Sequence, residues 1–280
     1  MKVVVVGNIA QSLVNFRGPL LRAMVGRGHE VTAVGPEDDA QHEAALRALG
    51  VEYRVVPLRR ASFNPLHDLS FLLALARLLR ELRPDVFLGY TIKPVIYGNL
   101  AARLAGVRSR GALITGLGYA FGTGSVKQRA LGKVVQGLYR LALAGASVVF
   151  FQNPDDEREF LRLGLATPEQ AELVAGSGVD LTRFHPSPPR DAPLTFLLIA
   201  RLIREKGIDL FVAAARELKR RHPDARFQLL GPLDPNPTAV TADEVASWQR
   251  EGIIEYLGET PDVRPYLAAA SVFVLPSYYR

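Results

Sequence analysis

Eleven short apolar runs alternate with stretches of helical pattern along the whole chain. Continuous apolar strands, each followed by about 10–20 residues of helix, form parallel sheets that helices cover on both faces. Several runs end in Gly or Pro, at the edge where open α/β sheets place their ligands. The sequence therefore predicts an α/β fold. The runs are residues 2–7, 30–35, 52–57, 85–90, 111–116, 147–152, 171–176, 194–200, 226–231, 253–258 and 271–276.

A proline-rich segment divides this pattern into two blocks. Residues 185–193 hold four of the chain's 19 prolines, and such segments act as stiff linkers between domains. We therefore expect two Rossmann-like, doubly wound domains with parallel sheets, residues 1–188 and 189–280, and a cleft between them. The second block holds only four of the eleven runs, so we expect its domain to be incomplete.

Composition and missing motifs exclude several classes of protein. The chain has no cysteine, which favours a reducing compartment such as the cytoplasm. No run approaches the roughly 18 apolar residues of a membrane-spanning helix, and the first residues do not form a signal peptide. The five histidines lack metal-ligand spacing, and the turn at Gly7 lacks the further glycines of a dinucleotide site. We expect no cofactor and no metal, and chemistry that depends on positioning and electrostatics.

Two cations stand where a predicted buried strand gives way to a helix. Arg201 and Lys206 follow the run 194–200, and Gly207 comes next. The start of a helix has unpaired N–H groups and the positive end of the helix dipole, so it repels cations unless an anion lies between them. One interpretation is solvated charge with Glu205 as the partner. The other is a diphosphate site, which a guanidinium and an ammonium suit well.

These cations lie within a series of sequence words that resembles one enzyme family, the retaining glycosyltransferases of the GT-B fold, family 4. The segments TIKPVIYG and TGLGYAF are similar to those of one branch of this family, which transfers N-acetylhexosamine or related sugars to undecaprenyl-diphosphate-linked acceptors. The segments that resemble the family as a whole cover nearly the whole chain in the expected order. They are GYTIKPVIYGNLAAR (89–103), VAGSGVDLTRFHP (174–186), ARLIREKGIDLFVAAA (200–215), LGPLDPNPTAV (230–240) and IEYLGETPDVRPYLAAASVFVLPSYYR (254–280).

The resemblance implies an acceptor-binding first domain and a second domain that binds a UDP-sugar. Arg201 and Lys206 match the family's R-x4-K word, whose cations hold the donor's diphosphate and stabilise the departing leaving group. They are the catalytic candidates. The remaining donor-binding candidates are Gly7 and Asn8 near the phosphates, Ser177, Gly178 and Asp180 lining the cleft, and Leu257 and Gly258 beside the uracil.

The chain departs from the family pattern at two places. Many relatives carry a His where this chain has Leu117, Gly118 and Tyr119, so we name no general base, and the donor's own phosphate can accept the acceptor's proton. The family's E-x7-E word is absent, so we expect the chain as given to be weakly active or inactive. Two alternatives stay open: a UDP-sugar 2-epimerase, which needs carboxylate and His acid–base groups, and a non-catalytic lipid- or nucleotide-binding module.

Residues near the end of the run 85–90 are the candidates for binding the acceptor. Lys93 opens a predicted helix there and can hold the acceptor's diphosphate, or it can be an ordinary capping or surface lysine. Tyr90, Thr91 and Tyr97 lie close to it in the sequence.

A membrane surface is a further expected partner, because the acceptor is lipid-linked. The predicted helix 126–145 carries a basic stripe with Arg129, Lys133 and Arg140, and an opposite apolar side that includes Val134 and Leu141. An outer helix with its apolar side on the sheet would show the same pattern. Arg59, Arg60 and Phe63 form a second basic and aromatic candidate contact with anionic lipid. We therefore expect a protein that can rest on the inner membrane face, and no nucleic-acid binding.

Overall fold

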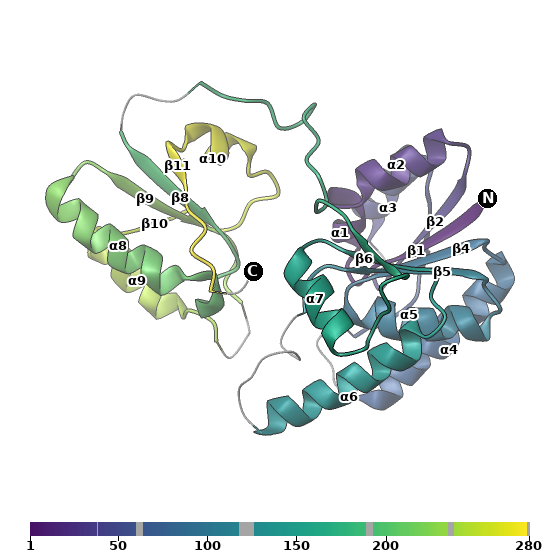
Figure 1. The fold of residues 1–280 in the computed structure, drawn as a ribbon. Coiled ribbons are helices and arrows are strands. Elements are labelled where there is room, and N and C mark those ends of the chain that lie inside the picture. The colour runs from purple at the N-terminus through teal and green to yellow at the C-terminus, as the bar shows by residue number, and fades with distance from the viewer. Residues whose placement is uncertain (38, 60–63, 118–125, 189–192, 235–237, 279–280) are drawn as a thin grey trace. The chain divides into compact units, whose positions relative to one another are not determined.

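The computed structural model describes residues 1–37, 39–59, 64–117, 126–188, 193–234 and 238–278. They form two compact units, Met1–Val179 and Asp180–Arg280, each of which has its own parallel sheet (Figure 1). The α/β fold with two parallel sheets is confirmed. The domain boundary at 188–189 stays a prediction. The membrane candidates Arg60 and Phe63 lie outside the described residues, as do Gly118 and Tyr119.

The sheet of Met1–Val179 has seven parallel strands in the order β3-β2-β1-β4-β5-β6-β7. The order reverses between β1 and β4, so the crevice beyond their carboxyl ends is the topological switch point, where doubly wound folds bind ligands. The strands are β1 (Lys2–Val6), β2 (Glu30–Gly35), β3 (Glu52–Val55), β4 (Val86–Tyr90), β5 (Ser109–Ile114), β6 (Val148–Phe151) and β7 (Ala171–Leu173).

Helices cover both faces of this sheet because β1 is apolar on both sides. Val3 and Val5 pack in a cluster with α1, α2 and α3, whereas Val4 and Val6 pack with α4 and α5. A third cluster joins α5, α6 and α7 to β5 and β6. The helices are α1 (Ala10–Asn15), α2 (Gly18–Gly26), α3 (Ala40–Ala48), α4 (Pro65–Leu82), α5 (Ile92–Leu104), α6 (Val126–Leu143) and α7 (Pro154–Arg162).

The sheet of Asp180–Arg280 has four parallel strands in the order β10-β9-β8-β11, with its own reversal between β8 and β11. One face carries α8 and α9, whose cluster includes Trp248, and α10 lies on the other face. The elements are β8 (Thr195–Ile199), the 3-10 helix η2 (Arg204–Lys206), α8 (Ile208–Arg221), β9 (Arg226–Leu230), α9 (Ala242–Arg250), β10 (Glu255–Tyr256), α10 (Arg264–Ala269) and β11 (Val272–Phe273).

All eleven predicted strands occur, but the edge strands are shorter than their apolar runs. The run 253–258 contains only two strand residues, because β10 pairs with β9 alone and the chain turns at Gly258, whose φ is 74°. Similarly, only three residues of the run 171–176 form a strand, since β7 pairs with β6 alone.

The apolar side predicted for α6 is partly wrong. Val135 and Leu138, also predicted on this side, do pack against the core together with the buried Tyr139, Ala142 and Leu143, whereas Val134 and Leu141 are 61% and 53% exposed. Tyr139 sets this orientation, because its ring packs edge-on against Phe160 of α7 with 5.1 Å between centroids. Within the described ranges, no helix is both long enough and apolar enough to cross a membrane.

Candidate functional site

Four of the predicted donor residues, Arg201, Lys206, Leu257 and Gly258, follow the carboxyl ends of strands in the sheet of Asp180–Arg280, where Gly231 also lies. Arg201 follows β8, Gly231 follows β9, and Leu257 and Gly258 follow β10. Parallel strands end on one edge, so these segments are neighbours: the Gly231 N–H donates to the Gly258 carbonyl at 2.7 Å, and the Tyr256 hydroxyl donates to the Gly231 carbonyl at 2.9 Å.

Arg201 has an acidic partner that the sequence did not indicate. Its Nη1 lies 3.0 Å from Oδ2 of Asp234, in the loop after β9, and the Arg201 side chain is 52% exposed. Glu205, the partner considered from the sequence, instead accepts a hydrogen bond from Thr238 Oγ1 at 2.8 Å. The Asp234 side chain is only 13% exposed, so an anionic ligand must compete with Asp234 for the half-exposed guanidinium of Arg201.

Lys206 is the last residue of η2, and no hydrogen bond or ion pair of its ammonium occurs in the described part of the chain. Gly207 follows as the N-cap of α8, with no side chain capping the helix. The neighbouring Arg204, by contrast, forms ion pairs with both Asp209 and Glu244. Hydrogen bonds from the Thr241 backbone and from Arg204 lower the pKa of Glu244 to about 2. Arg204 therefore stabilises the fold, while Lys206 is available to a ligand.

The turn that carries Lys206 is in backbone contact with the segment after β11. A Cβ at Gly207, whose φ is 71°, would lie 2.1 Å from the Pro276 carbonyl oxygen. The Tyr278 N–H also donates to the Glu205 carbonyl at 2.9 Å. The turn after β8 is thus held against the turn after β11, at the switch point of this sheet.

In Met1–Val179, three predicted residues meet at the β1/β4 switch point. A Cβ at Gly7 would lie 2.3 Å from the Tyr90 hydroxyl oxygen, so only glycine allows Tyr90 to lie there. Asn8 is half-buried beside it, and the Tyr90 hydroxyl is 3.0 Å from Ser12 Oγ. Thr91, the N-cap of α5, has a φ of 67° and a buried hydroxyl with no partner in the described residues.

Lys93 lies in a buried ion pair between α4 and α5. Its Nζ is 2.6 Å from Asp68 Oδ1 and donates to the Arg59 carbonyl at 2.8 Å, and the Lys93 and Asp68 side chains are 13% and 8% exposed. Lys93 is therefore neither a free phosphate-binding cation nor a surface lysine in this fold. The contact with the acceptor stays a prediction, and the ion pair would have to rearrange to provide it.

The predicted Ser177, Gly178 and Asp180 fall on both sides of the division between the two units. Ser177 Oγ accepts from Gln152 Nε2 and from Arg17 Nη1, each at 3.1 Å. Asp180 Oδ1 accepts from the backbone and hydroxyl of Thr182. Arg17 is a residue that the sequence analysis missed, since nothing in its local pattern marks it as buried.

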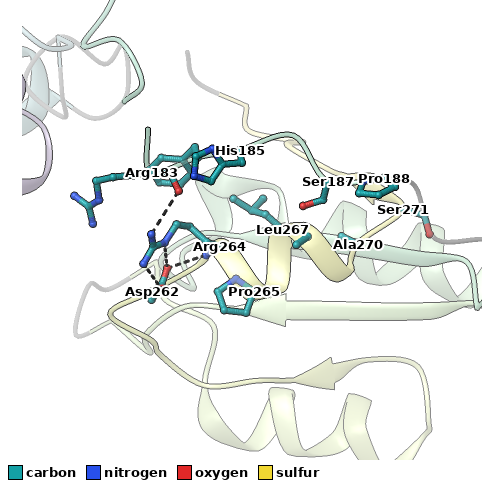
Figure 2. Close-up of a pocket in the computed structure, with 12 residues that line it drawn as sticks. Arg183, His185, Ser187, Pro188, Asp262, Arg264, Pro265, Leu267, Ala270 and Ser271 are labelled. Atoms are coloured by element: carbon teal, nitrogen blue, oxygen red, sulfur yellow. Dashed lines mark hydrogen bonds and ion pairs between the residues drawn. The ribbon is translucent and has the colours of Figure 1, made fainter. Parts of the chain in front are cut away.

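A hollow of about 720 Å³ beside α10 contains none of the predicted site residues (Figure 2). It runs along residues 183–188 and α10 to Ser271, which precedes β11. Figure 2 shows Arg264 directed onto Asp262, with two side-chain hydrogen bonds of 2.8 Å, which together with the Arg264 backbone lower the pKa of Asp262 to about 2. Among the described residues no group of three or more His, Asp or Glu is arranged to hold a metal ion.

We expect the stability of Met1–Val179 to fall between pH 10 and 12. Burial raises the pKa of Tyr90 to about 12, and burial and a hydrogen bond with Asp68 raise that of Tyr97 to about 12, against 10.0 in the unfolded chain. The neutral tyrosines therefore stabilise the fold fully below pH 10, and this contribution is lost as the pH rises to 12. Urea unfolding at about pH 9 and about pH 11.5 measures the loss. Tyr97→Phe should lose less stability than the wild type; equal losses would contradict the assignment for Tyr97.

Two family models match the chain. One, described as "Glycosyl transferase 4-like domain", matches residues 16–176, and the other, "Glycosyl transferases group 1", matches residues 193–280. The N,N'-diacetylbacillosaminyl-diphospho-undecaprenol alpha-1,3-N-acetylgalactosaminyltransferase of Campylobacter jejuni is 30% identical over 99% of this chain and 75% of that protein. The UDP-Gal:alpha-D-GlcNAc-diphosphoundecaprenol alpha-1,3-galactosyltransferase of Escherichia coli is 24% identical over 80% of this chain and 60% of its own length.

Solved structures agree with the fold. Sucrose-phosphate synthase from Thermosynechococcus elongatus matches 100% of this chain and 76% of its own, with a TM-score of 0.76 and 17% identity. A UDP-GlcNAc 2-epimerase from Neisseria meningitidis matches less well, with a TM-score of 0.60, 14% identity and coverage of 95% of this chain and 74% of its own. At these identities both likenesses show the fold alone, so the epimerase alternative gains no support for its chemistry.

Proposed function

Since this chain belongs to the family 4 glycosyltransferases of the GT-B fold and is therefore a transferase, we propose that it transfers a hexose or N-acetylhexosamine from a UDP-sugar. The acceptor is a polyprenyl-diphosphate-linked sugar or another glycan, in the synthesis of a surface polysaccharide or glycan. The anomeric configuration is retained. Both curated relatives named above act, by their names, on undecaprenyl-diphosphate-linked sugars, and this supports the acceptor class.

The observation that supports the donor site most strongly is the position of Lys206. Its ammonium has no partner within the described ranges, and it directly precedes the uncapped start of α8, a helix of 14 residues. The positive end of a helix and an unneutralised ammonium favour an anion between them. Arg201 adds a planar guanidinium that is 52% exposed and must exchange its contact with Asp234 for one with the ligand. We assign the UDP diphosphate to this turn.

The proposed chemistry needs only positioning and charge. As the bond between the sugar and the diphosphate breaks, negative charge grows on the leaving phosphate, and Arg201 and Lys206 stabilise it. The acceptor hydroxyl gives its proton to the same phosphate, so no protein base is required. In this proposal the half-buried Leu257 and Gly258 contact the uracil.

The test of this function is donor binding together with sugar transfer. Calorimetry should show UDP binding more tightly than ADP, and labelled sugar from a UDP-N-acetylhexosamine should appear on a prenyl-diphosphate-linked acceptor. The absence of both would contradict the proposal. Binding to lipid vesicles without UDP binding would instead favour the lipid-binding module.

We also propose that α6 rests on an anionic membrane surface. Arg129 and Lys133 are exposed and make no ion pair in the described part of the chain. Val134 and Leu141, roughly a third of a turn around the helix from this basic stripe, are exposed as well. Arg140, the third predicted residue, is less available, because it donates to the Leu163 and Gly164 carbonyls at the end of α7.

Charge reversal on α6 is expected to weaken vesicle binding. Each cation near an anionic surface contributes about 1 kcal/mol, so Arg129→Glu with Lys133→Glu should lower the partition coefficient by roughly 30-fold or more. Co-sedimentation with phosphatidylglycerol vesicles measures it. Arg22→Glu with Arg27→Glu is the matched control, since it makes the same charge change at exposed positions of α2 and just after it. Equal binding by both double variants would exclude α6 as the contact.

A further inference from the structure

Arg17 is a buried cation at the β1/β4 switch point. It is the N-cap residue of α2, it is 6% exposed, and its guanidinium carbon lies 4.9 Å from the centroid of the Tyr90 ring. Tyr90 in turn touches Gly7, the residue after β1. Arg17 is therefore inside the crevice where a doubly wound sheet binds its ligand.

No carboxylate in the described part of the chain neutralises this guanidinium. Arg17 forms no ion pair in the described part of the chain, and its Nε is buried without a hydrogen-bond partner. The acidic residue that acts electrostatically on Tyr90 is Glu37, but its carboxylate accepts a hydrogen bond from the Ala10 N–H at 3.0 Å and does not pair with Arg17. Burial lowers the pKa of Arg17, yet arginine stays protonated in proteins. An unpaired buried charge costs several kcal/mol, and among the described residues Arg17 is a buried cation without an anionic partner.

The groups around Arg17 are suited to an oxyanion. The Ser12 and Tyr90 hydroxyls lie 3.0 Å apart, and Ser177 Oγ accepts from both Arg17 and Gln152. A phosphate oxygen in the place of Ser177 Oγ would keep the Arg17 Nη1 and Gln152 hydrogen bonds, and a second oxygen could reach the free Nε. Ser177 is exposed between Gly176 and Gly178, whose φ values are 73° and 71° and where nothing lies within 4 Å of an added Cβ.

We propose that Arg17 binds a phosphate group of a substrate, in a subsite completed by Ser12, Tyr90, Gln152 and the displaceable Ser177. The planar guanidinium binds two oxygens of one phosphate side by side. This inference rests on the proposed function only for the identity of the ligand. The phosphate belongs either to the diphosphate of the lipid-linked acceptor or to that of the nucleotide donor.

The test uses the full chain carrying Arg201→Gln and Lys206→Met, so that these two cations no longer bind diphosphate in Asp180–Arg280. In this background Arg17→Met is expected to weaken inorganic pyrophosphate binding at least 10-fold in calorimetry, while the ligand-free protein unfolds at the same or a higher urea concentration, because an unpaired buried charge is gone. Arg22→Met, on the exposed side of α2, is the control and should change neither. A purely structural Arg17 predicts the reverse, lower stability with unchanged pyrophosphate affinity, and that result would overturn the inference.

Two further arms complete the experiment. If Arg17→Met does not fold, Arg17→Lys is the second variant, because it keeps the positive charge but loses the planar guanidinium. It should bind pyrophosphate several-fold more weakly than the chain with Arg17; unchanged affinity would overturn the inference. Geranyl diphosphate and UDP then identify the source of the phosphate. If Arg17→Met loses affinity for geranyl diphosphate alone, the subsite belongs to the acceptor, and if it loses affinity for UDP alone, the subsite belongs to the donor. Arg17-dependent pyrophosphate binding in a chain that neither binds UDP nor transfers sugar would support the subsite and contradict the proposed function.

Discussion

Replacing Arg201 with Gln and Lys206 with Met together is expected to weaken UDP binding by roughly 100-fold or more. A charge-assisted hydrogen bond contributes about 1.5–3 kcal/mol, and the double variant removes at least two of them. Lys206 should account for the larger share, because its ammonium gives up no partner in the described residues when it binds the diphosphate. Arg201 must first leave Asp234, which reduces its net contribution.

The control for this variant neutralises cations elsewhere in the same unit. Arg216→Gln with Lys219→Met removes the same two charges from the exposed side of α8, where Arg216 pairs with Glu251 and Lys219 donates to the Gly252 carbonyl. Calorimetry with UDP should show an affinity within about threefold of the wild type for this control. If both double variants lose affinity equally, overall charge and not the turn after β8 attracts the nucleotide.

Replacing Gly207 with Ala is expected to destabilise Asp180–Arg280 by about 2–5 kcal/mol. Two effects add: the left-handed φ of 71° is unfavourable to any residue with a Cβ, and the new methyl would lie 2.1 Å from the Pro276 carbonyl oxygen. Relief of this collision moves the turn away from the segment after β11. Because Lys206 is the adjacent residue, we expect UDP affinity to fall as well. Urea unfolding and calorimetry measure the two effects.

Gly252→Ala is the control that separates the cost of the left-handed backbone from the cost of the steric clash with Pro276. Gly252 has nearly the same φ, 69°, but nothing lies within 4 Å of an added Cβ. It should lose only the conformational part, about 1–2 kcal/mol, and keep its UDP affinity. Equal losses of stability in the two variants would mean that the contact with Pro276 does not hold the turn in place.

The strands could be predicted because buried parallel strands are continuous apolar runs between turn residues. Their ends could not, because they depend on pairing: β7 stops where its neighbour β6 stops, and β10 stops at the partner of Leu229, one residue before the end of β9. The buried side of α6 was also beyond the sequence pattern. Val134 and Tyr139 are both acceptable core residues, and the fold buries Tyr139, whose ring packs against Phe160, while Val134 is exposed.

In the candidate site, too, some features could be predicted from the sequence and others could not. The positions of Arg201 and Lys206 after β8 follow from the strand-to-helix pattern, and Gly7 and Tyr90 meet because β1 and β4 are neighbours. Long-range partners do not follow from the sequence. Asp234 is 33 residues from Arg201, Asp68 is 25 from Lys93, and Ser177 is 160 from Arg17. Which cations are neutralised, and which are left for a ligand, therefore became visible only in the fold.

A crystal structure of the chain soaked with UDP tests the central claim most directly. We predict that the diphosphate lies at the start of α8, with Lys206 Nζ and the Arg201 guanidinium within hydrogen-bond distance of its oxygens and Asp234 released from Arg201. A diphosphate bound elsewhere, with the Arg201–Asp234 pair intact and the Lys206 ammonium still in solvent, would contradict the account.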